Sequence, residues 1–381
     1  MSTRSGRRRA QAALLALALG AARAAWSATP PAVPSPVASA APAPDVVTVK
    51  LPFTADALDA EYDRAGTLHV AFSHGHSFYY TQRLAGQSEF ARPITLGTLP
   101  KGVDPEAPPQ IAVWPNGNPC VLWKGGGGIL MARSSDGGKT FAPVSTDSLL
   151  IKGGAIEVPT LVVGGDGALH LVWVDHRDPK DPGDMVAAHL YFATTRDHGR
   201  TWTPARALTK TTRKARRACP CCQPSVAAGP GGELWIAYRT SQDNVKEVAV
   251  LHSSDSGRNF TVQQVSDNKW YVKGCPTSGP SLAVAGNQMA LIWMADQDLF
   301  AVTSADAGRT FTRPTKLGTG FFHQAAGQRD RPVMLFEQGT QTLAWRAGDK
   351  APARVDAPPR GRLVAAPSGR FELIAFERGE E

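Results

Sequence analysis

One eight-residue pattern occurs four times in this chain and constrains its fold more than any other feature. It has the form Ser/Thr-x-Asp-x-Gly-x-Thr/Asn-aromatic and contains Asp136, Asp197, Asp255 and Asp306. These aspartates follow one another at steps of 61, 58 and 51 residues (197−136, 255−197, 306−255). A pattern that returns at such a period indicates a repeat architecture built from similar supersecondary units.

The residue types of the pattern suit a tight turn between two strands. Side chains of Asp and of Ser or Thr form hydrogen bonds with backbone N–H groups inside a turn, and glycine adopts conformations that other residues resist. The final aromatic residue gives the turn an apolar anchor. We therefore expect the four aspartates to be structural, rather than catalytic or calcium-binding carboxylates.

A second repeat consists of strands that end in an aromatic residue. Segments such as Leu169–Trp173 and Leu234–Tyr238 are almost continuously apolar, as buried strands are, and helical periodicity is nearly absent. The seven aromatic positions are Phe72, Trp123, Trp173, Tyr238, Trp293, Phe336 and Phe376. Short, evenly spaced strands of this kind predict an all-β fold, a β-propeller of four-stranded antiparallel blades.

The ends of the chain bear on the number of blades. The last unit, 362–376, contains only two expected strands, and the strand expected at 46–53 has no partner in the first unit. Pairing the N-terminal strand with the last blade would close the ring and remove exposed edges. This arrangement predicts seven blades, one of them shortened, with six as the alternative.

The first 45 residues differ in composition from the rest. Four arginines precede the apolar stretch Ala10–Gly20, and small residues follow it, so residues 1–28 read as a signal peptide cleaved after Ala24 or Ala28. Residues 29–45 are rich in Pro and Ala and predict a flexible tether, and 46–381 forms the propeller. We expect a periplasmic or secreted protein.

Charge and hydropathy narrow the classes of partner. The formal net charge of +8 falls to +3 (8−5) when the five arginines of residues 1–28 are removed, which gives little support for nucleic-acid binding. No later segment is apolar enough to cross a bilayer. We expect a monomer that does not span the membrane.

The four turn motifs resemble the Asp boxes, or BNR repeats, of the sialidase superfamily. The segments Cys219–Pro224 and Trp270–Pro276 resemble an exported bacterial branch of these propellers with a Cys-x-Cys-Cys motif. This resemblance implies that substrate binds on the face opposite the Asp-box turns. The residues that we assign to that face as candidate ligand contacts are Asp175, His176, Arg177, Arg239 and Glu157.

The loop Asp175–Arg177 is the most suggestive of these candidates. An aspartate and an arginine at a pocket mouth can hold a carboxylate or a sugar, and the alternative is a salt bridge within the loop. Arg239 follows directly on an aromatic strand end, and the same two alternatives apply to it.

Four cysteines form a second candidate site. Cys219, Cys221 and Cys222 precede one inner strand and Cys275 precedes the next, at the open face. In an exported protein we expect one or two disulfides, including the possibility of a strained Cys221–Cys222 pair. The alternatives are a thiolate site for copper(I) or zinc and a redox role. Cys120 is expected to be a buried free thiol.

Two functions of different classes remain open. The resemblance implies an exo-sialidase or related glycoside hydrolase that acts on terminal acidic sugars. Three arginines would hold the substrate carboxylate, a Tyr–Glu pair would supply the nucleophile and an Asp the acid/base. Arg177, Arg239 and Arg346 could supply the arginines, and Tyr238 or Tyr271 the nucleophile. The Phe/Tyr-Arg-Ile-Pro segment that carries the first arginine in that family is missing here.

The second function is a non-catalytic exported propeller. It would bind a ligand, a metal or a protein partner at the cysteine face, and a carbohydrate or a periplasmic protein is the expected partner. The missing arginine segment favours this interpretation, because Asp boxes mark a fold rather than a reaction.

Overall fold

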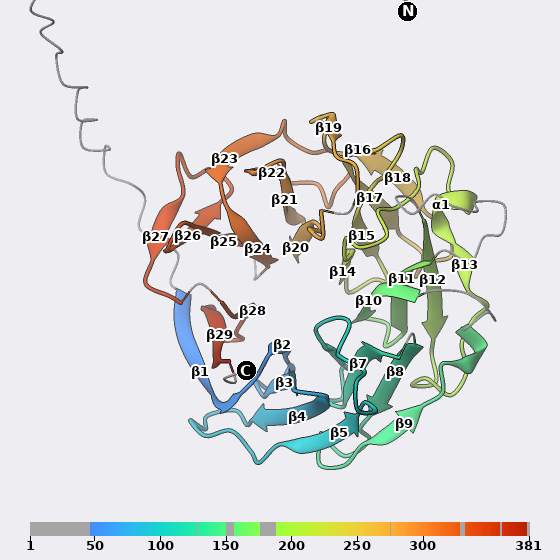
Figure 1. Ribbon diagram of the computed structural model, residues 1–381, viewed down its shortest axis with the longest axis vertical. Helices are drawn as coiled ribbons and strands as arrows, with labels where there is room; N and C mark the ends of the chain where they lie inside the picture. The colour runs from blue at the N-terminus through green and yellow to red at the C-terminus, as the bar shows by residue number, and fades with distance from the viewer. Residues whose placement is uncertain are drawn as a thin grey trace, which may run out of the picture. The chain divides into compact units, whose positions relative to one another are not determined.

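A computed structural model of the chain describes residues 46–126, 128–149, 156–175, 188–274, 276–327, 332–358 and 360–378. All of them belong to one compact unit, Ala40–Glu381. Their strands form seven sheets arranged around a central axis (Figure 1). The expected signal peptide (1–28) and the expected tether (29–45) precede the described residues, so both assignments stay predictions.

Six sheets have four strands each, hydrogen-bonded in chain order. The first three sheets are β2 (Ala57–Tyr62), β3 (Leu68–His74), β4 (Ser77–Arg83), β5 (Ile94–Thr98); β6 (Gln110–Val113), β7 (Pro119–Gly125), β8 (Gly128–Arg133), β9 (Ala142–Val144); β10 (Ile156–Val163), β11 (Leu169–Asp175), β12 (His189–Thr195), β13 (Arg206–Ala207). The next three are β14 (Ser225–Ala228), β15 (Leu234–Arg239), β17 (Val248–Ser253), β18 (Thr261–Gln264); β20 (Ser281–Ala285), β21 (Gln288–Ala295), β22 (Asp298–Ser304), β23 (Thr315–Thr319); β24 (Phe321–Ala326), β25 (Val333–Gln338), β26 (Gln341–Arg346), β27 (Ala353–Val355).

The seventh sheet closes the ring. It contains β28 (Arg362–Ala365), β29 (Phe371–Glu377) and the N-terminal strand β1 (Val46–Thr54), in the order β1-β29-β28. This confirms the seven-bladed propeller, with one shortened blade, over the six-bladed alternative. The blade differs from the regular pattern because β1 runs parallel to β29, with Val46 opposite Phe371.

The remaining regular structure is small. A ribbon of β16 (Val245–Lys246) and β19 (Trp270–Tyr271) stands apart from the blades, and the helical elements are the single turns α1 (Leu208–Thr211) and η1 (Asp147–Leu149). Accordingly, the described residues contain no helix of the length and apolar character needed to cross a bilayer.

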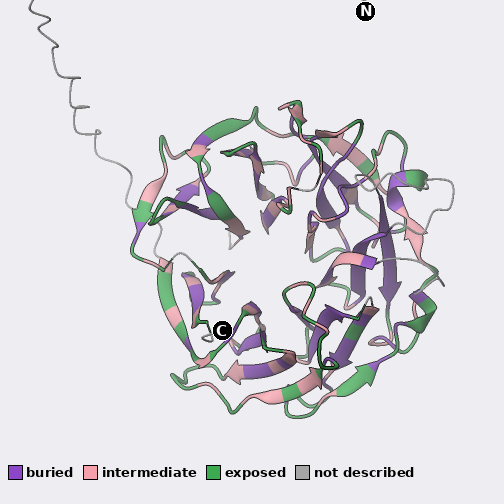
Figure 2. Cartoon of the chain, in the orientation of Figure 1, coloured by how far each residue is buried: buried purple, intermediate pink, exposed green. Residues whose placement is uncertain are grey.

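The apolar core lies between neighbouring blades rather than in one central mass. Each of seven hydrophobic clusters draws its side chains from two adjacent sheets; Trp173, for example, packs with Leu122 of the preceding blade. The seven predicted aromatic positions all fall on the second strand of a sheet. These second strands are buried, whereas the outermost strands carry the exposed side chains (Figure 2).

The four repeated turns join the third and fourth strands of four blades. In the first of them, Asp136 Oδ1 accepts hydrogen bonds from Thr140 N (2.9 Å) and Ser134 Oγ (2.7 Å), and Thr140 Oγ1 donates to Oδ2 (2.6 Å). The bonds from Thr140 hold the pKa of Asp136 below its ordinary value, with a further contribution from Ser134. Asp197, Asp255 and Asp306 accept the equivalent bonds. The carboxylates are therefore engaged within their own turns.

Candidate functional site: the central cavity and its cysteine wall

The propeller axis contains a cavity of about 1030 Å³. The first strand of every blade contributes to its wall, through Asp59, Gln110, Glu157, Ser225, Ser281, Gln324 and Arg362. Polar residues occur on these strands because the innermost strand of a blade faces the channel instead of a neighbouring sheet. The cavity is thus a polar chamber with walls of rigid strands.

An ion pair joins the first and last blades across the cavity wall. Arg362 Nε lies 2.7 Å from Asp59 Oδ1, and the Asp59 carboxylate also accepts hydrogen bonds from the backbone N–H groups of Ala60 and Ile111, both at 3.0 Å. The Asp59 side chain is almost fully buried, whereas that of Arg362 is partly open to the cavity. This leaves the guanidinium able to donate to a ligand.

Glu61 lies on β2, as Asp59 does, and the pKa of its carboxyl group is raised. Burial raises the pKa of Glu61 to about 8, helped by repulsion from Asp59 and opposed by a hydrogen bond from the Val113 backbone and by the charge of Arg362. At neutral pH this carboxyl is mainly protonated. It can therefore donate a hydrogen bond into the cavity, whereas Asp59 can only accept.

A second charged group links blades two and three. Lys124 Nζ bonds to Glu157 Oε2 at 2.8 Å and also to Glu106 Oε2. Burial lowers the pKa of Lys124, but the bonds with Glu106 and Glu157 outweigh that effect and leave it raised. The predicted contact Glu157 thus lies in the cavity wall, with its charge shared with a lysine.

Some of the backbone strain of the described chain lies at this cavity. Three non-glycine residues of its lining have positive φ values: Val158 (40°), Thr277 (50°) and Phe322 (48°). The strand register shifts beside Val158 in β10 and beside Phe322 in β24, which indicates bulges. Each such residue costs on the order of 1–3 kcal/mol, and strain of this kind gathers at binding and catalytic sites.

One stretch of the rim is aromatic. Phe321 and Phe322 are 53% and 59% exposed, although apolar side chains of this size are usually buried. Arg360 lies over the Phe322 ring at 5.3 Å from its centroid. The bulge in β24 holds the two phenyl groups beside the cavity.

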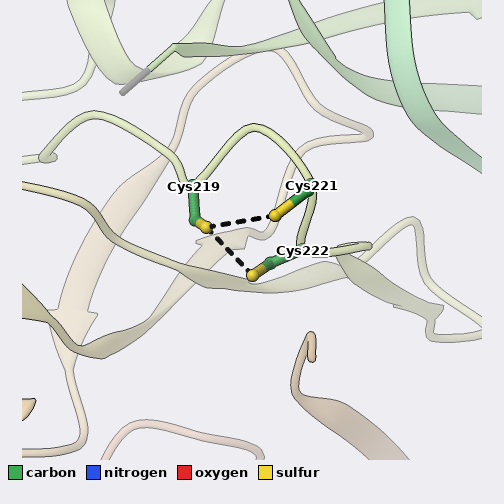
Figure 3. Close-up of side chains that lie close together, drawn as sticks. All are labelled: Cys219, Cys221 and Cys222. Carbon is green, nitrogen blue, oxygen red and sulfur yellow. Dashed lines mark hydrogen bonds between the residues drawn. The ribbon is translucent and has the colours of Figure 1, made fainter. Parts of the chain in front are cut away.

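The cysteine cluster forms another part of the wall (Figure 3). The segment after α1 is anchored by Cys219 N, which donates to the Arg239 carbonyl at 2.8 Å, and it turns at Cys222 N, which donates to Cys219 O. Cys221 lines the cavity, whereas Cys219 and Cys222 are buried behind it. Cys219 Sγ lies 3.0 Å from Cys222 Sγ and 3.9 Å from Cys221 Sγ.

The three sulfur atoms lie within 4.8 Å of one another, close enough to surround one metal ion. Their chemical states differ, because Cys219 and Cys222 are free thiols and Cys221 is disulfide-bonded. As it stands, the cluster offers two thiols, fewer than the four ligands of a structural zinc site. Cys275 lies outside the described residues. Cys120 is a buried free thiol, as predicted.

Buried cations surround the two thiols. The Cys222 thiol donates to Cys219 and lowers the pKa of Cys219, helped by the charges of Lys246 and Arg239. Burial raises the pKa of Cys222, and so does the neighbouring Cys219 sulfur. The cluster thus favours a thiolate at Cys219 and a neutral thiol at Cys222.

Arg239 belongs to this cluster rather than to the cavity lining. It is buried, donates from Nε to the Ser278 carbonyl and from Nη2 to the Met294 carbonyl, both at 2.7 Å, and lies over the ring of Trp270. Its proposed contact with a ligand stays a prediction. Asp175 is buried and accepts a hydrogen bond from Trp173 Nε1 at 3.1 Å.

The other sequence candidates are placed as follows. His176 and Arg177 lie outside the described residues, so the predicted Asp175–Arg177 pair stays a prediction. Tyr238 is buried and donates to the Arg216 carbonyl at 3.1 Å. Neither Tyr238 nor Arg346 nor the exposed Tyr271 belongs to the described lining of the cavity.

Sequence reasoning missed Asp59, Glu61 and Arg362, which lie on the first strands of blade one and blade seven. The available signal was the alternation in Leu58-Asp59-Ala60-Glu61, which places two carboxylates on one face of a strand.

Structures similar to this one include sialidases and arabinanases. A Hadza microbial sialidase, Hz136, matches with a TM-score of 0.47 and 17% identity over 74% of this chain and 63% of that chain, less than two thirds of its length. An alpha-L-arabinanase of Penicillium chrysogenum matches with a TM-score of 0.44 and 16% identity over 71% of this chain and 89% of that chain.

A leech intramolecular trans-sialidase matches with a TM-score of 0.47 and 12% identity over 80% of this chain and 79% of that chain. No protein-family model matches the chain, and no curated protein does.

Proposed function

We propose that this protein is an exported binding propeller that takes a neutral, hydroxyl-rich ligand of the carbohydrate class in its central cavity. The observation that carries the proposal is the composition of the described cavity wall, which combines paired charges, a protonated carboxyl and an exposed aromatic rim. Pockets of this kind orient a ligand through a few well-placed polar groups.

The charges of the wall favour a neutral ligand over an ionic one. The Asp59 carboxylate is paired with Arg362, and those of Glu106 and Glu157 share Lys124. Glu61 is mainly protonated at neutral pH. With Glu61 protonated, these groups leave one net negative charge (three carboxylates against two cations), so the wall disfavours an anion. It offers acceptors and donors together, which suits hydroxyl groups that both donate and accept.

The aromatic rim supports the same class of ligand. Phe321 and Phe322 expose apolar ring faces next to polar groups, and a sugar offers C–H faces beside its hydroxyls. The bulge that exposes these rings costs backbone strain. A ligand that covers the rings would bury apolar surface at roughly 25 cal/mol per Å².

Hydrolysis of terminal acidic sugars is the alternative, and the wall favours it less. A sugar carboxylate needs guanidinium partners that are free to bind it. Arg362 is the one arginine among the described lining residues, and Asp59 neutralises its charge, so it offers hydrogen-bond donors to a hydroxyl group but little net attraction for a carboxylate.

Copper(I) or zinc at the cysteine cluster stays a prediction beside this function. Three thiolates would require Cys221 to be reduced, because its sulfur is engaged in a disulfide. Elemental analysis of protein purified from the periplasm, before and after mild reduction, tests for either metal.

The proposed ligand class is tested by titration calorimetry with neutral oligosaccharides and with sialosides. We expect a neutral oligosaccharide to bind and Phe322→Ala to weaken it by about 5- to 30-fold, which corresponds to roughly 1–2 kcal/mol. Tyr271→Ala is the matched control, since it removes an exposed ring outside the described cavity lining. Turnover of a fluorogenic sialoside, or equal losses in both variants, would contradict the proposal.

A further inference from the structure

The cysteine cluster contains features that binding in the cavity does not use. Two free thiols, Cys219 and Cys222, are almost fully buried, and a disulfide sulfur, that of Cys221, stands 3.9 Å from the first of them. Free thiols packed against a disulfide sulfur are the reactants of thiol–disulfide exchange. Figure 3 shows the Cys219 sulfur joined by dashed lines to both of the other sulfurs.

The surroundings divide the roles of the two thiols. The Cys222 S–H group points at Cys219 Sγ, at 3.0 Å, and the buried Lys246 lowers the pKa of Cys219 further. Arg239 adds a buried guanidinium whose Nη1 atom has no hydrogen-bond partner within the described part of the chain. Such a site stabilises a thiolate at Cys219 while Cys222 keeps its proton.

Access to the cluster runs through one sulfur. Cys221 lines the central cavity, whereas Cys219 and Cys222 lie behind it. A small thiol or disulfide that enters the cavity therefore meets Cys221 first. The buried sulfurs of Cys219 and Cys222 therefore exchange with molecules in the cavity through Cys221.

We propose that Cys219, Cys221 and Cys222 form a thiol–disulfide exchange centre that reacts with small disulfides and thiols entering the central cavity. Cys219 is the attacking nucleophile, Cys222 is the resolving thiol and Cys221 is the sulfur that meets the substrate.

The exchange balances without an external oxidant. The Cys219 thiolate attacks the Cys221 sulfur, so that a Cys219–Cys221 bond forms and the former partner sulfur of Cys221 leaves as a thiolate. Cys222 then gives its proton to that thiolate and attacks the Cys219 sulfur. A Cys219–Cys222 bond forms, and Cys221 is released as a thiolate at the cavity wall.

The released thiolate can react with a small disulfide RSSR in the cavity. A Cys221–SR bond forms, the S–S bond of RSSR breaks, and RS⁻ leaves and takes a proton from solvent. The former partner of Cys221, now a thiol, then gives up its proton and attacks the Cys221 sulfur, so that the original disulfide re-forms and the second RS⁻ leaves with that proton. Two electrons have then passed from Cys219 and Cys222, which are left joined by a disulfide, to the small disulfide. The same steps in reverse let a small thiol reduce the buried pair.

The experiment follows each sulfur by mass spectrometry. Purified full-length protein is equilibrated in glutathione buffers of defined potential, quenched in acid, alkylated and digested. We expect a Cys219–Cys222 or Cys219–Cys221 link to appear, with a matching gain of alkylation or glutathione at Cys221. The rate of Cys219 alkylation should rise at a pH below the value of about 8.5 for an ordinary thiol.

Single substitutions separate the roles. Cys219→Ser should abolish both links, and Cys222→Ser should trap the Cys219–Cys221 link or glutathione on Cys221. Cys120→Ser is the matched control, because it removes a buried free thiol in another blade and should behave as wild type.

Two outcomes would overturn the proposal. One is that Cys219 and Cys222 stay fully alkylatable at every potential while the bond of Cys221 is unchanged. The other is that a stoichiometric metal ion protects the thiols and its removal alone exposes them. Circular dichroism of each variant confirms that a loss of exchange does not reflect a loss of fold.

Discussion

At the scale of single residues, side chains of one type take different roles according to what surrounds them. Asp136 lies in a turn where the hydroxyl groups of Ser134 and Thr140 and the N–H group of Thr140 donate to its carboxylate, so it stays ionised. Glu61 lies in a cavity wall beside Asp59, so burial and repulsion favour its protonated form. The sequence identifies Asp136 and Glu61 only as two acidic residues. Their surroundings determine that Glu61, and not Asp136, can donate a hydrogen bond.

Glu61 makes stability depend on pH. Because its pKa is raised to about 8 in the fold, its contribution to stability is fully present below the unfolded value of about 4.3 and is lost as pH rises to 8. Relative to Glu61→Gln, we expect the wild type to lose about 1–2 kcal/mol between pH 4.5 and 8, reduced from the full linkage value by the water in the cavity. Urea denaturation across this range measures it. A constant difference between the two proteins would contradict the pKa shift.

Gly138 tests the close packing of the repeated turns. Its φ is 87°, and a Cβ there would lie 2.2 Å from the Tyr80 hydroxyl. Gly138→Ala should therefore cost about 2–4 kcal/mol, from backbone strain of about 1–2 kcal/mol together with displacement of the tyrosine. Thermal denaturation measures the loss.

Gly137 supplies the control for that variant. Its φ is 72°, but a Cβ there would meet nothing within 4 Å. Gly137→Ala should cost only the backbone strain, about 1–2 kcal/mol. Equal losses at the two glycines would show that contact with Tyr80 adds nothing.

At the scale of elements, the strands could be predicted from the sequence because every blade buries its second strand in the same way. Apolar second strands lie between two neighbouring sheets, so their pattern is strong, and all seven aromatic positions were placed correctly. The first strands face the polar cavity on one side. Their mixture of polar and apolar residues, as in β2, includes residues of the candidate site. It indicates a strand less clearly than an apolar sequence does.

The direction of β1 was not predictable. Pairing of the N-terminal strand with the last blade followed from the need to remove edges, and the strand does pair with β29. Either orientation satisfies edge hydrogen bonds and leaves the same side chains for burial. The sequence therefore specified closure but not the parallel register.

Leu51 tests the closure by β1. It is 1% exposed and packs in the cluster between the last and first blades. Leu51→Ala should destabilise the protein by about 2–5 kcal/mol, because a cavity forms where the ring is joined. Val47→Ala, at an exposed position of the same strand, should change stability by less than about 0.5 kcal/mol. Similar small effects in both variants would show that closure contributes little to stability.

At the scale of the whole molecule, seven sheets around an axis bring together residues that lie far apart in the chain. Asp59 and Arg362 are separated by almost the full propeller sequence, yet they form one ion pair. Local motifs such as Cys219–Cys222 can be recognised in a sequence. Contacts across the ring require the blade number and the closure to be known first.

The central claim is that the axial cavity is the ligand site, and a crystal structure with the tightest-binding neutral oligosaccharide tests it most directly. We predict a sugar in the cavity, with hydroxyl groups within hydrogen-bond distance of Glu61 and Arg362 and one face against Phe322. A sugar bound on the outer strands, with an empty cavity in the same crystal, would contradict the account.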